Sequence, residues 1–182
     1  MRFDIDIRMA DEGRVPFAEI AQINIIDAKT PDPIRLVDEN GLTVLAMRNN
    51  HPPVVDSYAL RFDAGGKSIT FSGDTRYLPS LAGFAKNSDV LVHEAMLAKG
   101  LDYVLAKTKT GDDRLKNHLL AAHSFAEQAG QIAASANVGH LVLNHLIPPE
   151  RDICSDADWQ AEARRNFDGP CLVGRDGMVI EF

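Results

Sequence analysis

The spacing of apolar residues changes near residue 72, and this change most limits the fold that the chain can adopt. Before it, short apolar runs alternate with turns, and after it they alternate with helical segments. Such a pattern predicts an α/β (α+β) fold with a mixed sheet and flanking helices. The 182 residues suffice for a single domain with a substantial core, and we take residues 1–182 as one domain.

Each part of the chain predicts its own elements. Residues 1–50 form a strand-rich segment, with strands expected at 3–7, 21–26 and 42–47. A hairpin is expected from 54–62 and 68–71, closed at Gly65-Gly66. Later residues predict helices at 78–86, 124–136 and 156–167, strands at 89–92 and 138–143, and a hairpin of 171–173 with 178–182. Ser124 and Glu127 match a capping box at the start of the second helix, whereas residues 98–117 give no clear pattern.

Composition and charge disfavour some classes of partner. The net charge of −7 offers no general electrostatic footprint for nucleic acid or for an anionic membrane. No apolar run approaches the ~18 residues of a membrane span, and the first residues are not a signal peptide. The two cysteines, Cys154 and Cys171, have no metal-type spacing, so we expect buried free thiols. These features favour a cytoplasmic protein without a membrane partner.

Several expected strands stop beside residues that can bind a metal. Asp74 follows one strand, His145 follows another, His51 lies after a third, and His93-Glu94 ends a fourth. If these strands share a sheet, their ends can gather on one rim. Imidazole and carboxylate suit Zn, Mn or Fe, and a carboxylate can bridge two ions. His123, directly before an expected helix, is a further candidate for metal binding or catalysis.

Each of these residues also has a simpler interpretation. Gly73-Asp74 alone is typical of a turn. His118 lies among Lys116, Asn117 and Leu119, which indicates a surface or helix-side position, and His140 precedes a buried strand, which indicates a structural role. His51, His123 and His145 could each be structural if considered singly.

Four motifs occur together in one order. They read Ser72-Gly73-Asp74-Thr75, His93-Glu94-Ala95-Met96, His123-Ser124-Phe125 and Leu143-Asn144-His145, with His51 upstream. This set resembles the C-terminal half of the metallo-β-lactamase fold, in its ribonuclease Z and arylsulfatase-like branch. The likeness covers roughly residues 51–182.

The resemblance implies a two-metal hydrolase of phosphodiesters, sulfate esters or similar esters, acting on a small-molecule or nucleotide substrate. It implies two zinc ions, with manganese or iron as alternatives. Asp74 would bridge the ions, and His51 and His145 would each bind one. His123 would protonate the leaving group and Glu94 would orient it, with His93 as a further catalytic residue. Such paired ions lower the pKa of a bound water toward ~7 and stabilise an anionic transition state.

The sequence departs from the family pattern upstream of His51. The family's His-x-His-x-Asp-His cluster is absent, and residues 1–50 contain no histidine. Phe125 stands where the family usually has a small hydroxyl residue, and Met96 stands where it has threonine. We therefore expect the C-terminal half of a longer protein, or a natural truncation, whose ligand-bearing half (51–182) lacks part of the site and is inactive alone.

This expectation has a structural consequence. The family fold is a four-layer αββα sandwich, so a lone half would expose the inner face of its sheet. We expect the isolated chain to self-associate or to need a missing N-terminal half. Two alternatives remain: a non-catalytic α/β module or partner-binding half-domain without metal, and an unrelated α/β domain. The unrelated domain would place His51, Asp74 and His145 far apart.

Overall fold

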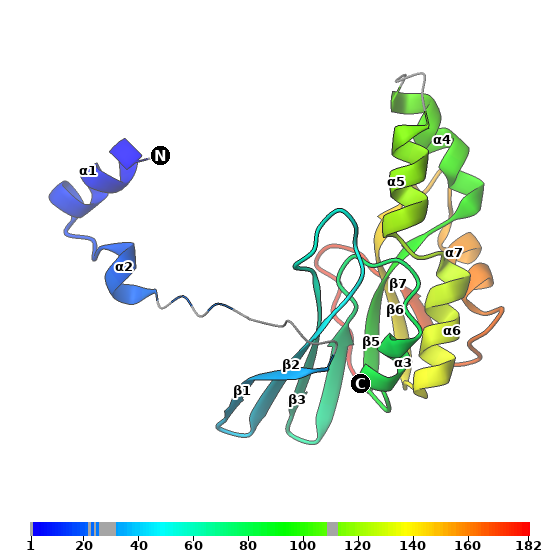
Figure 1. The fold of residues 1–182 in the computed structure, drawn as a ribbon, viewed down its shortest axis with the longest axis horizontal. Coiled ribbons are helices and arrows are strands. Elements are labelled where there is room, and N and C mark those ends of the chain that lie inside the picture. Colours follow the sequence, from blue (N-terminus) through cyan, green and yellow to red (C-terminus); the bar gives the residue numbers. More distant parts are fainter. Residues whose placement is uncertain (1, 22, 24, 26–31, 109–112) are drawn as a thin grey trace.

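A seven-stranded mixed sheet organises the chain (Figure 1). The computed structural model describes residues 2–21, 23, 25, 32–108 and 113–182. The strands lie in the sheet in sequence order: β1 Ile34–Glu39, β2 Leu42–Arg48, β3 Tyr58–Ala64, β4 Lys67–Phe71, β5 Val90–Met96, β6 His140–Ile147 and β7 Cys171–Val173. Within the described ranges, no helix is both long enough and apolar enough to span a membrane.

The first four strands pair antiparallel through tight turns. Glu39 pairs with Leu42, and Ala64 pairs with Lys67, so each of these two hairpins has a two-residue turn. Both turn residues have positive φ at Asn40-Gly41 and at Gly65-Gly66, as the right-handed twist of paired strands favours. The predicted Gly65-Gly66 hairpin is confirmed, whereas β1 was not predicted.

The last four strands are parallel, and helices connect them. The connecting helices are α3 Ser80–Phe84 before β5, α4 Ala98–Thr108, α5 Arg114–Ala122 and α6 Ala126–Ala136 before β6, and α7 Asp156–Ala163 before β7. The segment 98–117, which gave no clear pattern, thus holds α4 and the start of α5. These two helices stand side by side beyond the end of the sheet (Figure 1).

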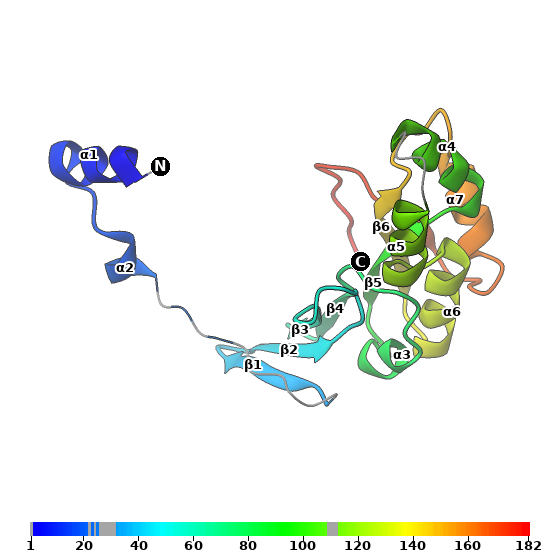
Figure 2. The ribbon, with the colours of Figure 1, turned by 45° about the horizontal axis from the view of Figure 1, so that its top comes forward.

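The main core lies between the parallel strands and helices α3, α6 and α7 (Figure 2). Leu91 and Leu141 are fully buried on this side of the sheet, and Trp159 of α7 is 1% exposed. A Cβ atom at Gly130 would lie 2.1 Å from the carbonyl oxygen of Ala163. Glycine on α6 therefore allows α7 to pack closely against it, and this contact fixes the helical layer behind β6 and β7.

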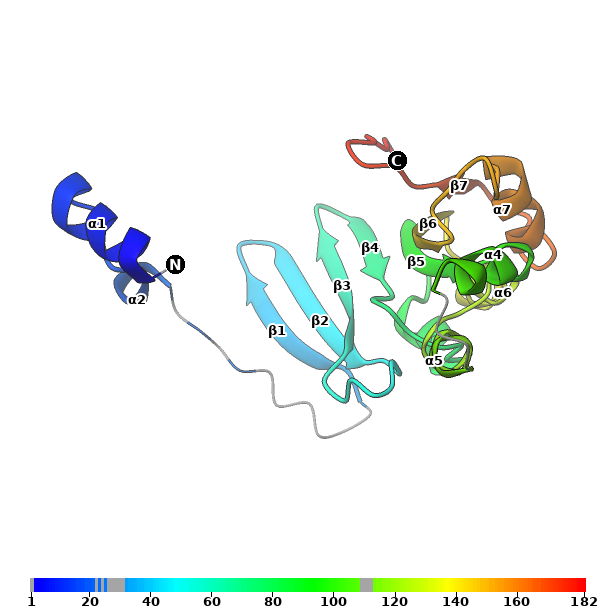
Figure 3. The same ribbon diagram turned by 90° about the horizontal axis from the view of Figure 1, so that it is seen from above.

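The opposite face of the sheet is also apolar, but the described helices do not cover it (Figure 3). The ring of Phe71 is 39% exposed there and meets the ring of Phe62 edge-on at 5.9 Å. The C-terminal residues cross the same face, with the ring of Phe182 5.5 Å from Nζ of Lys67. The expected mixed sheet with flanking helices is confirmed, and one of its faces retains exposed apolar side chains.

Of two strands predicted in the first segment, one is a helix and the other lies partly outside the described residues. Residues 3–7 lie in helix α1, Arg2–Glu12, in which Arg8 forms ion pairs one turn away with Asp4 at 3.1 Å and Glu12 at 3.6 Å. All of residues 4–12 are exposed, so the alternating apolar side chains in this segment do not pack against a core. Of the expected strand 21–26, residues 22, 24 and 26 lie outside the described residues, and 21, 23 and 25 are not in a strand. A short helix, α2 Phe17–Ile20, comes just before them.

The expected C-terminal hairpin is also wrong. Only its first strand, β7, forms, whereas residues 178–182 are outside any ladder. β7 pairs parallel with β6, and the chain beyond Gly174 turns onto the sheet face instead of returning beside β7.

Candidate active site

The loop after β4 places Asp74 at the rim of the sheet. Gly73 has a φ of 59°, and a Cβ there would lie 2.6 Å from the carbonyl oxygen of Tyr58. The side-chain amide of Asn49 donates to the Ser72 carbonyl at 2.7 Å, which ties this loop to the end of β2. Only glycine meets both the conformation and the close approach, so the sequence Gly73-Asp74 is a turn that also aims a carboxylate.

A β-bulge places His145. In the pairing of β5 with β6, Glu94 lies opposite Asn144 and Ala95 lies opposite Leu146, so His145 is the extra residue. Its φ is 41°, and this conformation turns its side chain out of the regular alternation of the strand. The imidazole Nε2 then lies 3.0 Å from Oδ2 of Asp74, and both side chains are about two-fifths exposed.

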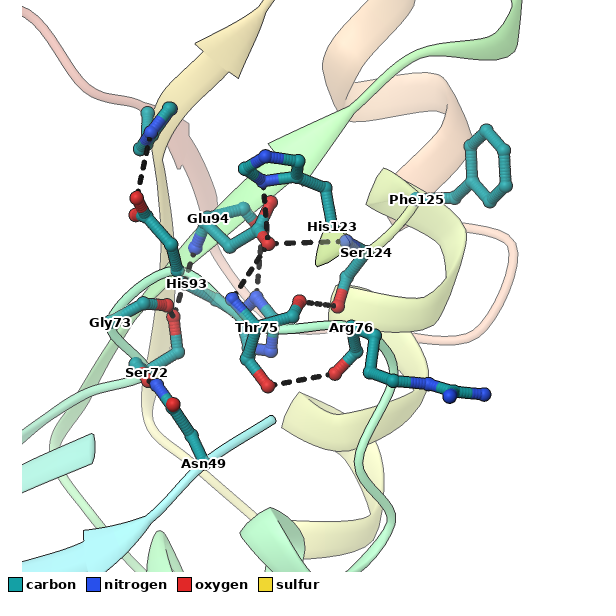
Figure 4. Close-up of polar contacts among 12 residues, drawn as sticks. Asn49, Ser72, Gly73, Thr75, Arg76, His93, Glu94, His123, Ser124 and Phe125 are labelled. Carbon is teal, nitrogen blue, oxygen red and sulfur yellow. Dashed lines mark hydrogen bonds and ion pairs between the residues drawn. The ribbon is translucent and has the colours of Figure 1, made fainter. Parts of the chain in front are cut away.

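Glu94 is the buried centre of the site (Figure 4). It is 1% exposed, and its Oε1 accepts hydrogen bonds from the backbone N–H groups of Thr75 at 2.9 Å and Ser124 at 3.2 Å. The same oxygen lies 3.2 Å from Nδ1 of His123. One carboxylate thus joins β5, the loop after β4 and the start of α6.

His123 is oriented by that carboxylate. It ends helix α5, and its extended backbone turns the chain toward α6. The hydrogen bond to Glu94 raises the pKa of His123 above its usual value, although partial burial opposes this. With Nδ1–H donating to Glu94, Nε2 is the nitrogen that can meet a substrate.

The residues after His123 differ from the predicted cap. Phe125 precedes α6, and its N–H donates to Gln128 at 2.9 Å, so the capping box lies one residue beyond the predicted Ser124–Glu127 pair. Ser124 cannot cap the helix because its buried hydroxyl donates to the Thr75 carbonyl at 2.7 Å. The ring of Phe125 points away from His123, so its presence does not block the site (Figure 4).

The predicted histidines converge. The ring centroids of His51 and His123 are 5.2 Å apart, and those of His123 and His145 are 5.4 Å apart. His118, predicted to be a surface residue, is exposed but also joins the group, 6.0 Å from His51 and 6.1 Å from His123. Because Asp74 contacts His145, the alternative of an unrelated domain with distant residues is wrong.

His93 has a different environment from the rim histidines. It is 1% exposed, and its Nδ1 lies 2.7 Å from the Glu94 carbonyl oxygen. Burial lowers the pKa of His93, which favours the neutral imidazole. A substrate does not reach this ring directly, and its catalytic role stays a prediction.

The described side chains do not complete a metal centre. Asp74 and His145 have the right donor types, but they pair with each other. Among the residues that the structure describes, no three His, Cys, Asp or Glu side chains are arranged to hold an ion. The roles of His51, Asp74 and His145 as zinc ligands therefore stay predictions, and we assign no chemical step to a metal.

Two hollows border the histidines. One, of about 660 Å³, lies beside His145 and is also lined by Asn144, Arg151 and Arg175. The other, of about 560 Å³, lies beside His51 in the loop after β2. A substrate bound at the rim thus has space beside His51 and beside His145.

Sequence and structure comparisons agree on the family. Residues 6–146 match the model of the beta-lactamase superfamily domain. A putative ribonuclease Z of Mycobacterium tuberculosis strain CDC 1551 is 30% identical over 163 residues, covering 85% of this chain and 69% of that protein. For ribonuclease Z of strain H37Rv the identity is again 30%, and the chain spans 57% of its length.

Solved structures show the same fold. The metallo-beta-lactamase fold protein YhfI from Bacillus subtilis is 25% identical with a TM-score of 0.60, covering 84% of this chain and 54% of that one. The short form of human tRNase Z has a TM-score of 0.53 at 21% identity, covering 81% of this chain and 46% of that one. The chain thus spans about half the length of both structures.

Proposed function

The chain belongs to the beta-lactamase superfamily, and from this membership we propose that it carries the proton-donating half of a site that hydrolyses phosphodiesters or related esters. The contact of Glu94 with His123 carries this proposal. A buried carboxylate orients the imidazole, and the Asp74–His145 pair lies at the same rim. The ribonuclease Z relatives support a phosphodiester as the substrate class.

In this proposal His123 acts as the general acid. Its raised pKa keeps a larger fraction of the imidazole protonated near neutral pH than an ordinary histidine would have. Nε2–H then donates its proton to the departing oxygen of the ester while Glu94 stabilises the imidazolium. The two hollows beside His51 and His145 would accept the two substituents of the phosphorus.

We also propose that turnover by these 182 residues alone is slow. Hydrolysis of a diester needs an activated water as well as an acid, and zinc would supply it in the complete family site. The donors described here do not form such a site, and no histidine precedes His51. Further donors would have to come from outside these 182 residues.

The test compares leaving groups. A dinucleotide loses an alkoxide, which needs a proton, whereas bis(p-nitrophenyl) phosphate loses a stabilised phenolate, which does not. With added Zn²⁺, His123→Asn should slow dinucleotide hydrolysis by about a hundredfold and affect the nitrophenyl ester far less. His140→Asn is the control, because residue 140 begins β6, at the end away from His145. An equal loss on both esters would contradict the role of His123 as an acid.

A second function is favoured by the pairing of Asp74 with His145. If these side chains hold each other and not an ion, the chain is a non-catalytic α/β module whose uncovered sheet face binds a partner. Folded wild-type protein in which phosphate shifts none of the rim histidines would support this alternative over the first.

The state of the two cysteines indicates the cellular compartment of the protein. Cys154 and Cys171 are free and buried, as predicted, and burial raises the pKa of both thiols, that of Cys171 to about 11. Inert unpaired thiols suit a reducing environment, so we propose a cytoplasmic location.

A further inference from the structure

A fourth histidine stands over the site. His118 lies on α5, and its ring contacts the rings of two rim residues that come from different elements, His51 and His123. Both contacts are edge-on, with interplanar angles of 87° and 88°. A histidine that merely covered a helix surface would face solvent alone, whereas this ring also faces the rim.

The end of α5 creates this arrangement. Residues 118 and 123 are five apart, so they would not share a face of a continuous helix. The N–H of His123 closes the helix on the Leu119 carbonyl at 3.1 Å, and the backbone then becomes extended. This change of direction brings the His123 ring back beside the ring of His118, one residue buried and the other exposed.

The rings of His118 and His123 can bind different oxygens of one substrate. His123 is committed to Glu94 through Nδ1, whereas His118 is exposed on a helix that stands beyond the sheet. Imidazoles whose centroids are about 6 Å apart can each donate an N–H to a different oxygen of one phosphate group. Because His118 is exposed, a substrate reaches it before the buried ring.

We propose that His118 is a substrate-binding residue that donates a hydrogen bond to a non-bridging oxygen of the scissile phosphate and so places the leaving group over His123. This inference rests on the proposed function, since it assumes a phosphoester at the rim. It assigns the α4–α5 pair a role in holding the substrate, beyond that of connecting β5 to β6.

The experiment measures binding without turnover. The full chain is titrated with inorganic phosphate while the imidazole signals of its histidines are followed by NMR. Wild-type protein should show phosphate-dependent shifts at His51, His118 and His123, and His118→Asn should weaken binding by about tenfold, the loss of one hydrogen bond to a charged group. His140→Asn serves as the matched control and should bind phosphate as the wild type does.

The outcomes separate the two proposals. If the wild type binds phosphate at His123 and His118→Asn binds it within twofold, the role of His118 is refuted and the proposed function stands. If phosphate shifts none of the rim histidines in the wild type, both proposals fall. His118→Gln repeats the measurement with a longer side chain, and circular dichroism of both variants checks the fold.

Discussion

Replacing Glu94 by glutamine removes the buried charge at the centre of the site and leaves its shape nearly unchanged. Oε1 of Glu94 accepts three N–H groups, from Thr75, His123 and Ser124. A hydrogen bond to a charged group contributes about 1 kcal/mol more than a neutral one, so three of them predict a loss of about 3 kcal/mol. For a chain of this size the midpoint of thermal unfolding should fall by about 6–12 °C.

The same substitution should change how stability depends on pH. The pKa of folded His123 is raised, chiefly by Glu94, so its contribution to stability is complete below the unfolded pKa and is lost as the pH rises through the folded pKa. In Glu94→Gln the desolvation of His123 remains without the carboxylate, so its pKa should fall. The stabilisation on the acidic side should then disappear. His93, whose pKa is lowered by burial, acts in the opposite sense in both proteins.

Urea unfolding between pH 5 and 8, with NMR titration of His123, measures both effects. Glu127→Gln is the matched control, because Glu127 is an exposed residue of α6 whose ion pair with Arg165, at 3.5 Å, is worth little. If Glu94→Gln unfolds within about 0.5 kcal/mol of the wild type, or if the pKa of His123 is unchanged, the picture of Glu94 as the charged centre is wrong.

Three further outcomes follow from the structure. In urea unfolding, Gly73→Ala should lower the free energy of unfolding by about 1–3 kcal/mol more than Gly177→Ala does. Both positions have positive φ, but only a Cβ at residue 73 would meet a backbone oxygen. Equal losses in the two variants would argue against this close approach. Equilibrium dialysis should find less than one tightly bound zinc per chain. If the wild type instead binds one or more ions, and His145→Ala loses them, the donors rearrange into a metal centre and this expectation is wrong. Light scattering should show that the wild type self-associates through the uncovered sheet face. Phe71→Lys, on that face, should weaken the association, whereas Leu120→Lys, at an exposed position of α5, should not. A monodisperse wild-type monomer would contradict this.

Turn residues and short apolar runs in the sequence correctly predicted part of the sheet. The Gly65-Gly66 turn and β2 follow from turn chemistry and apolar runs. Asp74, Glu94 and His145 gather because β4, β5 and β6 are parallel neighbours, which bring their ends to one rim.

The errors have identifiable physical causes. Residues 4–7 are all exposed, so the alternation that predicted a strand has no packing partner there, and the segment lies in a helix with two exposed ion pairs of Arg8. Ser124 fits a capping motif, yet its hydroxyl is taken by a tertiary contact with Thr75. His118 reaches the rim through the three-dimensional arrangement at the end of α5, and its sequence neighbours Asn117 and Leu119 gave no signal of this.

The bulge at His145 shows how the sheet accommodates its functional edge. Pairing of β5 with β6 resumes directly beyond the bulge, with Leu146 opposite Ala95 and Ile147 opposite Met96. The strained backbone is therefore confined to one residue, while the ladder on both sides of it remains in place. In evolutionary terms, position 145 can exchange its side chain without disturbing the core, so one scaffold can carry different chemistries at this edge.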